Sequence, residues 1–298
     1  MSISYEKYHG TSNDFVIVDA DEYVPDRGAF AREVCDRRDG VGVSGSGATG
    51  GSTDESVGAD GVLFLALEPR FSPPRAVMTL VQPDGSTAKM CGNGARCAAK
   101  WAAERTGADT VMLDTQAGTR RAEIDGERVT IEMGHVSFDA RGVPLGAERE
   151  YPIVAEEVEG LEVTAVNTGV PHAVAFVDDV ADVDLESVAP AVRNADVFPD
   201  GANVTLASRR EDGSFDQRTY ERGVEGETQS CGTGAVAIVA AARRLGRIER
   251  PTAAVFPPGG RLDVTVTDEN EAVLAGPAER EFEGEVSSTP KPRRVTRA

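Results

Sequence analysis

Two cysteines lie in nearly identical sequence contexts. Cys91 belongs to the segment MCGNGA (residues 90–95), and Cys231 belongs to SCGTGA (residues 230–235); each segment opens an Ala-rich run that predicts a helix. A thiol at a helix start lies beside unpaired backbone N–H groups and the positive end of the helix dipole, which favours thiolate. Glycines beside it allow backbone amides to approach an anion. The repetition predicts a pseudo-symmetric site with one thiol on each side of a small anionic substrate.

Two opposed thiols suit proton transfer at carbon. A thiolate removes a proton from one face of a carbon, and the thiol opposite delivers a proton to the other face, which inverts the stereochemistry. The α-carbon of an amino acid is a weak acid, so its carbanion needs hydrogen-bond donors around the carboxylate. The two helix starts supply such donors through the backbone of Gly92, Asn93, Gly94, Gly232, Thr233 and Gly234.

Five further residues are candidates for supporting roles. Arg222 suits bidentate binding of a carboxylate, and Glu221 suits acceptance of a substrate amine or of a thiol proton. His172, in a Gly-x-Pro-His turn, is a candidate proton acceptor beside Cys91. Asn13 and Asn203 offer two-way hydrogen bonding. The competing interpretations are a charged surface loop for the Glu-Arg pair, a structural core histidine, and turn or strand-end asparagines.

Composition narrows the class of protein. The chain has 298 residues, enough for two domains, and 40% hydrophobic residues support real cores. Its net charge of −19 disfavours nucleic acid and anionic membranes as partners. Few lysines among many acids resemble proteins of a high-salt cytoplasm. No apolar run has the length of a membrane span and the N-terminus lacks a signal-peptide layout, so we expect a cytoplasmic protein.

The other two cysteines carry no such signal. Cys35 and Cys97 lack flanking glycines, and we expect both to be packing residues. No CxxC pair is present and the chain has only three histidines, so we expect no metal site.

Both halves of the sequence follow one plan: strands, a Cys-Gly-x-Gly turn, a buried helix and more strands. Helices are predicted at 26–38, 92–106 and 232–246, and the last carries no polar side chain from Ala235 to Ala242. The plan predicts a duplicated α/β (α+β) fold with one cysteine at the cleft wall from each copy. A Gly/Ser/Thr-rich stretch at 43–57 predicts a flexible inserted loop. The polar, basic tail at 287–298 predicts disorder.

Seven motifs along the chain resemble those of diaminopimelate epimerases, in the same order. They are HGTSNDF (9–15), GADG (58–61), MCGNGAR (90–96), GVPH (169–172), YERG (220–223), GETQSCGTG (226–234) and PGGRL (258–262). The resemblance extends from residue 9 to about residue 280, essentially the whole chain.

The resemblance implies a fold, a reaction and a site. It implies two pseudo-symmetric domains, each a mixed β-sheet wrapped around a central buried helix, with the active site in the cleft between them. The expected domains are 1–132 plus 276–286, and 133–275. The implied reaction interconverts LL- and meso-diaminopimelate in lysine biosynthesis. It needs no cofactor or metal, and its acid–base pair is Cys91 and Cys231.

The resemblance also implies the substrate contacts. They are Asn13, Gln82, Asn203, Glu221, Arg222 and the backbone of Gly92, Asn93, Gly232 and Thr233. Two positions depart from the family pattern: Gln82 stands where the family often has Asn, and Val170 where some members have Asn. Both positions touch the distal end of the substrate in the family, so they bear on substrate preference.

Three other functions remain open from the sequence. One is a two-cysteine racemase of proline or hydroxyproline, which Asn93 and the Glu221-Arg222 pair disfavour. A second is a non-catalytic amino-acid-binding protein, which does not need two thiols. The third is a thiol-redox protein, which the lack of a CxxC pair disfavours. The expected partner is small-molecule diaminopimelate, and a homodimer is an open possibility.

Overall fold

The computed structural model describes residues 2–42 and 57–287. The loop predicted at 43–57 and the tail predicted at 287–298 lie outside these residues, apart from Val57 and Ser287. The chain divides into two compact units. Unit 1 is Met1–Thr119 with Ala278–Ala298, and unit 2 is Arg120–Pro277.

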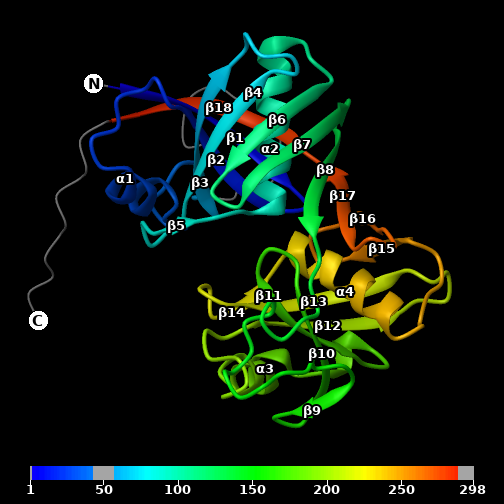
Figure 1. Cartoon of the computed structure of the whole chain (residues 1–298). Helices are drawn as coiled ribbons and strands as arrows, with labels where there is room; N and C mark the ends of the chain where they lie inside the picture. The colour runs from blue at the N-terminus through cyan, green and yellow to red at the C-terminus, as the bar shows by residue number, and fades with distance from the viewer. Residues whose placement is uncertain (1, 43–56, 288–298) are drawn as a thin grey trace, which may run out of the picture. The chain divides into compact units, whose positions relative to one another are not determined.

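Unit 1 is built on a mixed sheet around one helix (Figure 1). Antiparallel pairs join β18 to β1, β1 to β2 and β3 to β4, whereas β2 pairs with β3, and β4 with β6, in parallel. The strands are β1 (Ser2–Gly10), β2 (Asn13–Asp19), β3 (Gly61–Glu68), β4 (Arg75–Val81), β5 (Thr87–Ala88), β6 (Thr110–Thr115) and β18 (Glu279–Ser287).

Unit 2 repeats this arrangement. Antiparallel pairs join β10 to β11 and β12 to β13, whereas β11 pairs with β12, and β13 with β15, in parallel. The strands are β8 (Arg128–His135), β9 (Glu156–Val158), β10 (Leu161–Asn167), β11 (Pro171–Phe176), β12 (Asn203–Arg209), β13 (Phe215–Glu221), β14 (Gly226–Thr228), β15 (Thr252–Phe256), β16 (Leu262–Val266) and β17 (Glu271–Pro277). Strand β7 (Gly118–Asp125) begins at the end of unit 1 and pairs with β8.

The order of elements around each cysteine is therefore the same. In both units two antiparallel strand pairs follow one another, and the first strand of the second pair runs parallel to the last strand of the first pair. A strand of two or three residues, the cysteine, a helix and another parallel strand come next. The α+β class predicted from the sequence is confirmed.

A buried helix occupies the inner face of each sheet. Helix α2 (Gly92–Thr106) contacts β1, β2, β3, β4 and β6, and helix α4 (Gly232–Arg244) contacts β10 to β13 and β15 to β17. Both helices begin at the predicted residue. The run from Ala235 to Ala242 is fully buried, as predicted, because small apolar side chains let a sheet surround the helix closely.

Shorter helices cover the other faces. Helix α1 (Arg27–Val34) packs Phe30, Ala31 and Val34 into an apolar cluster with residues of β1, β2, β3 and β4. It ends before residue 38, the predicted end, because the Asp36 carboxylate accepts the N–H groups of Arg38 and Asp39 and closes a turn.

Helix α3 (Leu185–Arg193) is the counterpart of α1 in unit 2. It packs Leu185, Ala189 and Val192 onto the unit 2 sheet, and it contains Pro190. The sequence pattern did not indicate this helix.

The division between the units differs from the expected domains. Residues 120–132 were expected in the N-terminal domain but lie in unit 2, because β8 forms its ladder with β17. Residues 276 and 277 end β17 and also belong to unit 2. The last strand, β18, pairs with β1 in unit 1.

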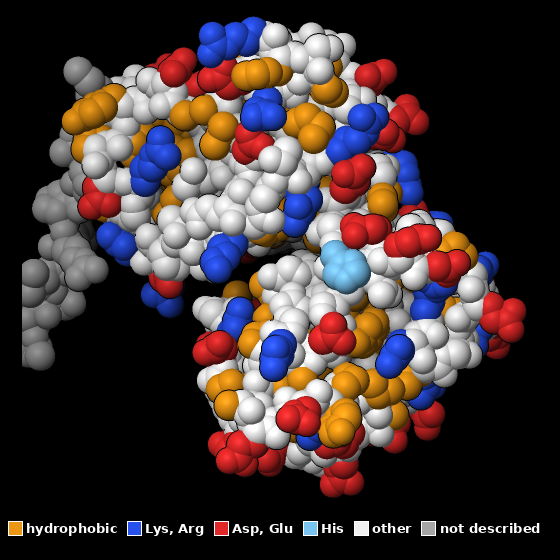
Figure 2. All heavy atoms as spheres, in the orientation of Figure 1, with side chains coloured by type: hydrophobic (Ala, Val, Ile, Leu, Met, Phe, Trp, Pro, Cys, Tyr) orange, Lys and Arg blue, Asp and Glu red, His pale blue; other side chains and the backbone are white. Residues whose placement is uncertain are grey.

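Positively and negatively charged side chains are mixed on the visible face of each unit, and apolar side chains are scattered between them (Figure 2). In the part of the chain that the structure describes, no helix is long and apolar enough to span a membrane.

Candidate active site

Cys91 caps the N-terminus of α2. Its backbone is extended (φ −142°, ψ 120°), and its carbonyl accepts the Ala95 N–H at 2.8 Å, the first bond of the helix. The short strand β5 precedes it and pairs with β4, which fixes where the helix starts. The half-buried side chain thus lies at the helix terminus predicted from the sequence.

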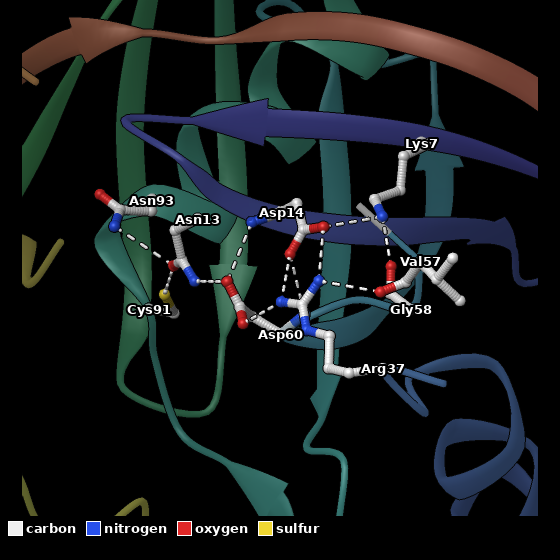
Figure 3. Close-up of polar contacts among 9 residues, drawn as sticks. All are labelled: Lys7, Asn13, Asp14, Arg37, Val57, Gly58, Asp60, Cys91 and Asn93. Carbon is white, nitrogen blue, oxygen red and sulfur yellow. Dashed lines mark hydrogen bonds and ion pairs between the residues drawn. The ribbon is translucent and has the colours of Figure 1, made fainter. Parts of the chain in front are cut away.

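The Cys91 thiol lies beside the side-chain amide of Asn13. Its Sγ is 3.8 Å from Asn13 Oδ1, and the same oxygen accepts Asn93 Nδ2 at 3.2 Å (Figure 3). Asn13 opens β2 after a two-residue turn in which Thr11 and Ser12 both have positive φ. That turn carries Asn13 over the start of α2, so three residues predicted for the site meet there.

Behind Asn13 lies a cluster of charged residues. Asn13 Nδ2 donates to the Asp60 carboxylate, which also accepts the Asp14 N–H at 3.1 Å. Arg37 bridges the two acids, binding Asp14 at 2.7 Å and 3.0 Å and contacting Asp60. The fully buried Lys7 lies 2.7 Å from Asp14. The parallel register of β2 and β3 brings the two acids together, because it pairs the residues that follow them.

The two acids respond oppositely to this setting. Burial opposes ionisation of Asp14, but Arg37 and Lys7 outweigh it and hold its pKa below the ordinary value. Burial and the charge of Asp14 raise the pKa of Asp60, which Arg37 and Asn13 only partly offset. Asp60 is therefore the harder of the two acids to ionise.

A buried arginine lies under the start of α2. Arg96 is fully buried; its Nη1 donates to Asn93 Oδ1 at 2.9 Å and its Nη2 to Thr11 Oγ1 at 3.0 Å. Burial lowers its pKa to about 10, while the Cys97 and Cys91 sulfurs act in the opposite direction. Arg96 is thus a buried cation close enough to the Cys91 thiol to influence its charge.

Cys231 caps α4 in the same backbone conformation. Its carbonyl accepts the Ala235 N–H at 2.9 Å and the Gln217 side-chain amide at 3.0 Å. Its Sγ lies 3.4 Å from Thr233 Oγ1. The residue is 5% exposed, so this thiol is buried more deeply than Cys91.

The protonated form of the Cys231 thiol is favoured. Burial raises its pKa well above the ordinary value, and the Glu221 carboxylate raises it further by its charge and by a hydrogen bond; Thr233 and the Gly234 N–H act against this. Glu221 is held in turn by Thr228, whose hydroxyl donates to Oε1 at 2.5 Å. The expectation that the helix start favours a thiolate is therefore wrong for Cys231 in this state, because desolvation outweighs the helix terminus.

His172 lies in the interior of unit 2. Its Nδ1 is 3.0 Å from Thr205 Oγ1, its Nε2 is 3.0 Å from Thr233 Oγ1, and Asn203 Nδ2 lies 3.4 Å from Nε2. Complete burial lowers its pKa to about 3, so the imidazole is neutral near pH 7. Through Thr233 it connects to Cys231. Its predicted role beside Cys91 stays a prediction.

Asn203 and Arg222 are also held within unit 2. The Arg222 N–H donates to Asn203 Oδ1 at 2.8 Å, and Arg222 Nη1 donates to the carbonyls of Asp200 and Gly201 at 3.0 Å and 3.2 Å. These bonds hold the backbone and the guanidinium of Arg222 in place. Asn203 contacts both Arg222 and, through its Nδ2, His172.

The predicted residues thus form two sets, one in each unit. Gln82 lies in the turn between β4 and β5, where its Oε1 accepts the Ser86 hydroxyl at 3.0 Å. The backbone of Gly92, Asn93, Gly232 and Thr233 forms the first turns of α2 and α4. Cys35 and Cys97 are buried, and burial raises the pKa of each thiol to about 12.

Two polar residues that contact the side chains facing the thiols have no role predicted from the sequence. Asp60 belongs to the GADG motif and Thr228 to the GETQ motif, so the motifs themselves were the available signal. Among the described residues, no three His, Cys, Asp or Glu side chains gather in a way that would hold a metal ion.

Solved structures define the fold class. The chain is similar to a phenazine biosynthesis PhzF family protein of Enterococcus faecalis (TM-score 0.65, 15% identity, 96% of this chain and 100% of the other). It is also similar to a hydroxyproline epimerase of Agrobacterium vitis (TM-score 0.62, 16% identity, 96% and 91%). At these identities the likeness establishes the fold only, an α+β fold with a mixed sheet.

Sequence relatives define the family. The sequence profile described as diaminopimelate epimerase matches residues 5–138 and 164–281. A diaminopimelate epimerase of Methanocella arvoryzae is 43% identical over 95% of this chain and 96% of its own, and one of Methanothrix thermoacetophila is 38% identical over 96% of both. The chain belongs to the diaminopimelate epimerase family and is an isomerase.

Proposed function

We propose that this protein interconverts LL- and meso-2,6-diaminopimelate by proton transfer between two thiols and one α-carbon. The observation that carries the proposal is the duplicated site: in a chain of this family, each of two units with the same strand order places a cysteine at the N-cap of its central helix. Two such groups are what inversion at an α-carbon needs.

The surroundings of the thiols support a division of labour. The Cys231 thiol donates a hydrogen bond to the Glu221 carboxylate, which is the proposed acceptor of the thiol proton during the reaction; the thiolate formed in this step removes the α-proton. The Cys91 thiol lies beside a neutral amide, Asn13, which accepts a hydrogen bond but not a proton. Cys91 therefore delivers its own proton to the opposite face of the carbanion. The reverse reaction uses the same groups in the opposite order.

The backbone of the two helix starts would stabilise the charge that develops on the substrate carboxylate. The first-turn N–H groups at Gly92, Asn93, Gly232 and Thr233 are the proposed donors. Arg222 and Asn203 are proposed to bind the charged groups of the substrate, with Asn13 and Gln82 as further contacts. The reaction proposed needs no metal and no pyridoxal phosphate, because the thiols and helix termini supply both the bases and the electrostatic stabilisation.

The wider setting follows from the family. We propose that the product serves lysine biosynthesis in the cytoplasm, and that the acidic, lysine-poor surface suits a high-salt interior. A homodimer is a further proposal, which the mass of the native enzyme in solution tests.

The proposal is tested by incubating the enzyme with LL-diaminopimelate in D₂O, without added cofactor and after dialysis against chelator. We expect the meso isomer to form with deuterium at the inverted carbon. L-Proline and trans-4-hydroxy-L-proline, assayed side by side, should be unchanged. Inversion of proline but not of diaminopimelate would overturn the substrate assignment, and activity restored only by a metal or pyridoxal phosphate would overturn the mechanism.

A further inference from the structure

Two side-chain amides beside Cys91 form a hydrogen-bonded chain with a fixed direction. Arg96 donates to Asn93 Oδ1 at 2.9 Å, Asn93 Nδ2 donates to Asn13 Oδ1 at 3.2 Å, and Asn13 Nδ2 donates to Asp60 Oδ2. Figure 3 shows the last two links, with the Cys91 sulfur pointing at the oxygen between them.

The direction of this chain follows from its ends. A guanidinium only donates hydrogen bonds, and an ionised carboxylate only accepts them. Arg96 at one end therefore requires the oxygen of Asn93, and Asp60 at the other requires the NH₂ group of Asn13. Either amide turned by 180° would place two donors or two acceptors against each other. The amide group nearest Cys91 thus has one permitted orientation, with its oxygen toward the thiol.

We infer that Asp60 is a positioning residue that, together with Arg96, holds the Asn13 oxygen against the Cys91 thiol and so maintains Cys91 as a proton donor. A carbonyl oxygen stabilises the S–H form of a thiol, whereas an N–H group in the same place would stabilise the thiolate. The inference rests on the acid–base role proposed for Cys91, but its test measures the thiol itself.

The cations around Asp60 are part of this arrangement. Asp60 and Asp14 are adjacent like charges, and Arg37 contacts both while Lys7 binds Asp14. Arg37 favours the ionised form of Asp60, against the burial and the charge of Asp14 that raise its pKa. The cluster thereby keeps an acceptor-only group at the end of the amide chain.

The test uses Asp60→Asn, which is nearly isosteric. Arg37 keeps its hydrogen bond to residue 60 only if the new carboxamide turns its oxygen to the guanidinium, and the NH₂ of the carboxamide then faces the NH₂ of Asn13. Asn13 loses its fixed orientation, and the Cys91 thiolate becomes easier to form. Asp14→Asn is the matched control, since Asp14 belongs to the same cluster but contacts Lys7, Arg37 and Asp60 rather than the Asn13 side chain.

The measurement is the rate of Cys91 alkylation by iodoacetamide between pH 6 and pH 11, in a Cys231→Ser background with native circular dichroism. We expect Asp60→Asn to move the midpoint of the profile down by about one pH unit, which is about a tenfold faster rate below the midpoint. Asp14→Asn should leave the midpoint unchanged. A change in the plateau alone, or equal shifts in both variants, would overturn the inference.

A second variant keeps the test valid if Asp60→Asn does not fold. In the exchange variant Asn13→Asp, Asp60→Asn the carboxylate and the carboxamide change places, and one hydrogen bond still joins them. A carboxylate then faces Cys91, so the midpoint should move above that of the parent. A midpoint at or below the parental value would show that the group facing the thiol does not control it. Loss of epimerase activity in the parental Cys91/Cys231 protein would concern the proposed function and leave this thiol titration interpretable.

Discussion

The two cysteine sites share a backbone but differ in the group that faces each thiol. In unit 1 the Cys91 sulfur meets the Asn13 amide oxygen, and in unit 2 the Cys231 thiol donates to the Glu221 carboxylate. Each acceptor is held by another group, Asp60 in the first case and Thr228 in the second. The two units therefore share the helix terminus. The side chain that faces each thiol decides whether an acceptor for the thiol proton is present.

The side chains packed against the first turn of each helix differ as well. A Cβ added to Gly94 would meet Leu63 and Phe15, both apolar, at 3.4 Å. A Cβ added to Gly234 would meet polar side chains, the nearest being Gln217 Nε2 at 2.6 Å. Unit 2 thus packs hydrogen-bonding side chains against Gly234, whereas unit 1 packs hydrocarbon against Gly94 and places its buried hydrogen bonds at Arg96.

The largest effects should come from the thiols. Cys91→Ala and Cys231→Ala should each lower the turnover of LL-diaminopimelate by roughly 10³-fold or more, because inversion needs a proton-accepting and a proton-donating group on opposite faces. Cys35→Ala, at a buried cysteine that caps α1, is the control and should keep the parental rate if it folds. Near-parental inversion by either active-site variant would remove the two-base proposal.

Glu221→Gln tests the contrast between the Asn13 amide that faces Cys91 and the Glu221 carboxylate that faces Cys231, because it replaces the carboxylate by an amide. Its turnover should fall by about 10²-fold, since Cys231 loses the group that takes its proton. The pKa of the Cys231 thiol in this variant should nevertheless fall, because the Glu221 carboxylate raises that pKa in the parent. The readout is the pH profile of alkylation in a Cys91→Ala background.

Glu225→Gln is the matched control for this substitution. Glu225 lies in the turn that follows Glu221, and its carboxylate pairs with Arg193 at 2.8 Å. It should change neither the turnover nor the alkylation profile. An unchanged profile in Glu221→Gln, or the same shift in both variants, would contradict the assignment of Glu221.

Local sequence predicted what local sequence determines. The Cys-Gly-x-Gly segments and the Ala-rich runs after them fixed the starts of α2 and α4, because capping and helix burial depend on neighbours in the chain. The environments of the thiols were not accessible in the same way. Asp60 reaches Asn13 only through the parallel register of β2 and β3, and the high pKa of Cys231 depends on burial among distant strands.

The same reason explains the errors in the fold. Residues 120–132 read as strands, but their assignment to a unit depends on the pairing of β8 with β17, which joins segments far apart in the sequence. Helix α3 escaped prediction because Pro190 interrupts its apparent pattern. The early end of α1 depends on one Asp36 turn that a propensity argument does not weigh.

The buried network of unit 2 should make that unit sensitive to acid. The unfolded chain protonates His172 near its ordinary pKa of 6.5, whereas the folded protein protonates it only near pH 3. Its contribution to stability is therefore complete above pH 6.5 and is lost as the pH falls toward 3. Between pH 7 and pH 5 this amounts to about 2 kcal/mol in the free energy of unfolding.

Urea unfolding of His172→Gln measures this contribution. The variant should lose less stability than the parent between pH 7 and pH 5, because glutamine does not titrate. His135→Gln, at a side chain that is 60% exposed, should retain the parental pH dependence. An identical pH dependence in the parent and in His172→Gln would show that the buried imidazole does not carry the effect.

The smallest effects should come from substitutions of the glycines. These substitutions distinguish the apolar surroundings of Gly94 from the polar surroundings of Gly234. Gly94→Ala should be nearly neutral, because contacts at 3.4 Å are offset by the better helix propensity of alanine. Gly234→Ala should destabilise by about 1–3 kcal/mol, since its Cβ displaces the Gln217 amide from the Cys231 carbonyl. Thermal unfolding of the two variants gives the comparison directly. Equal losses of stability would mean that the polar side chains around Gly234 accommodate a Cβ as readily as the apolar side chains around Gly94. They would also mean that the hydrogen bond from Gln217 does not fix the position of Cys231.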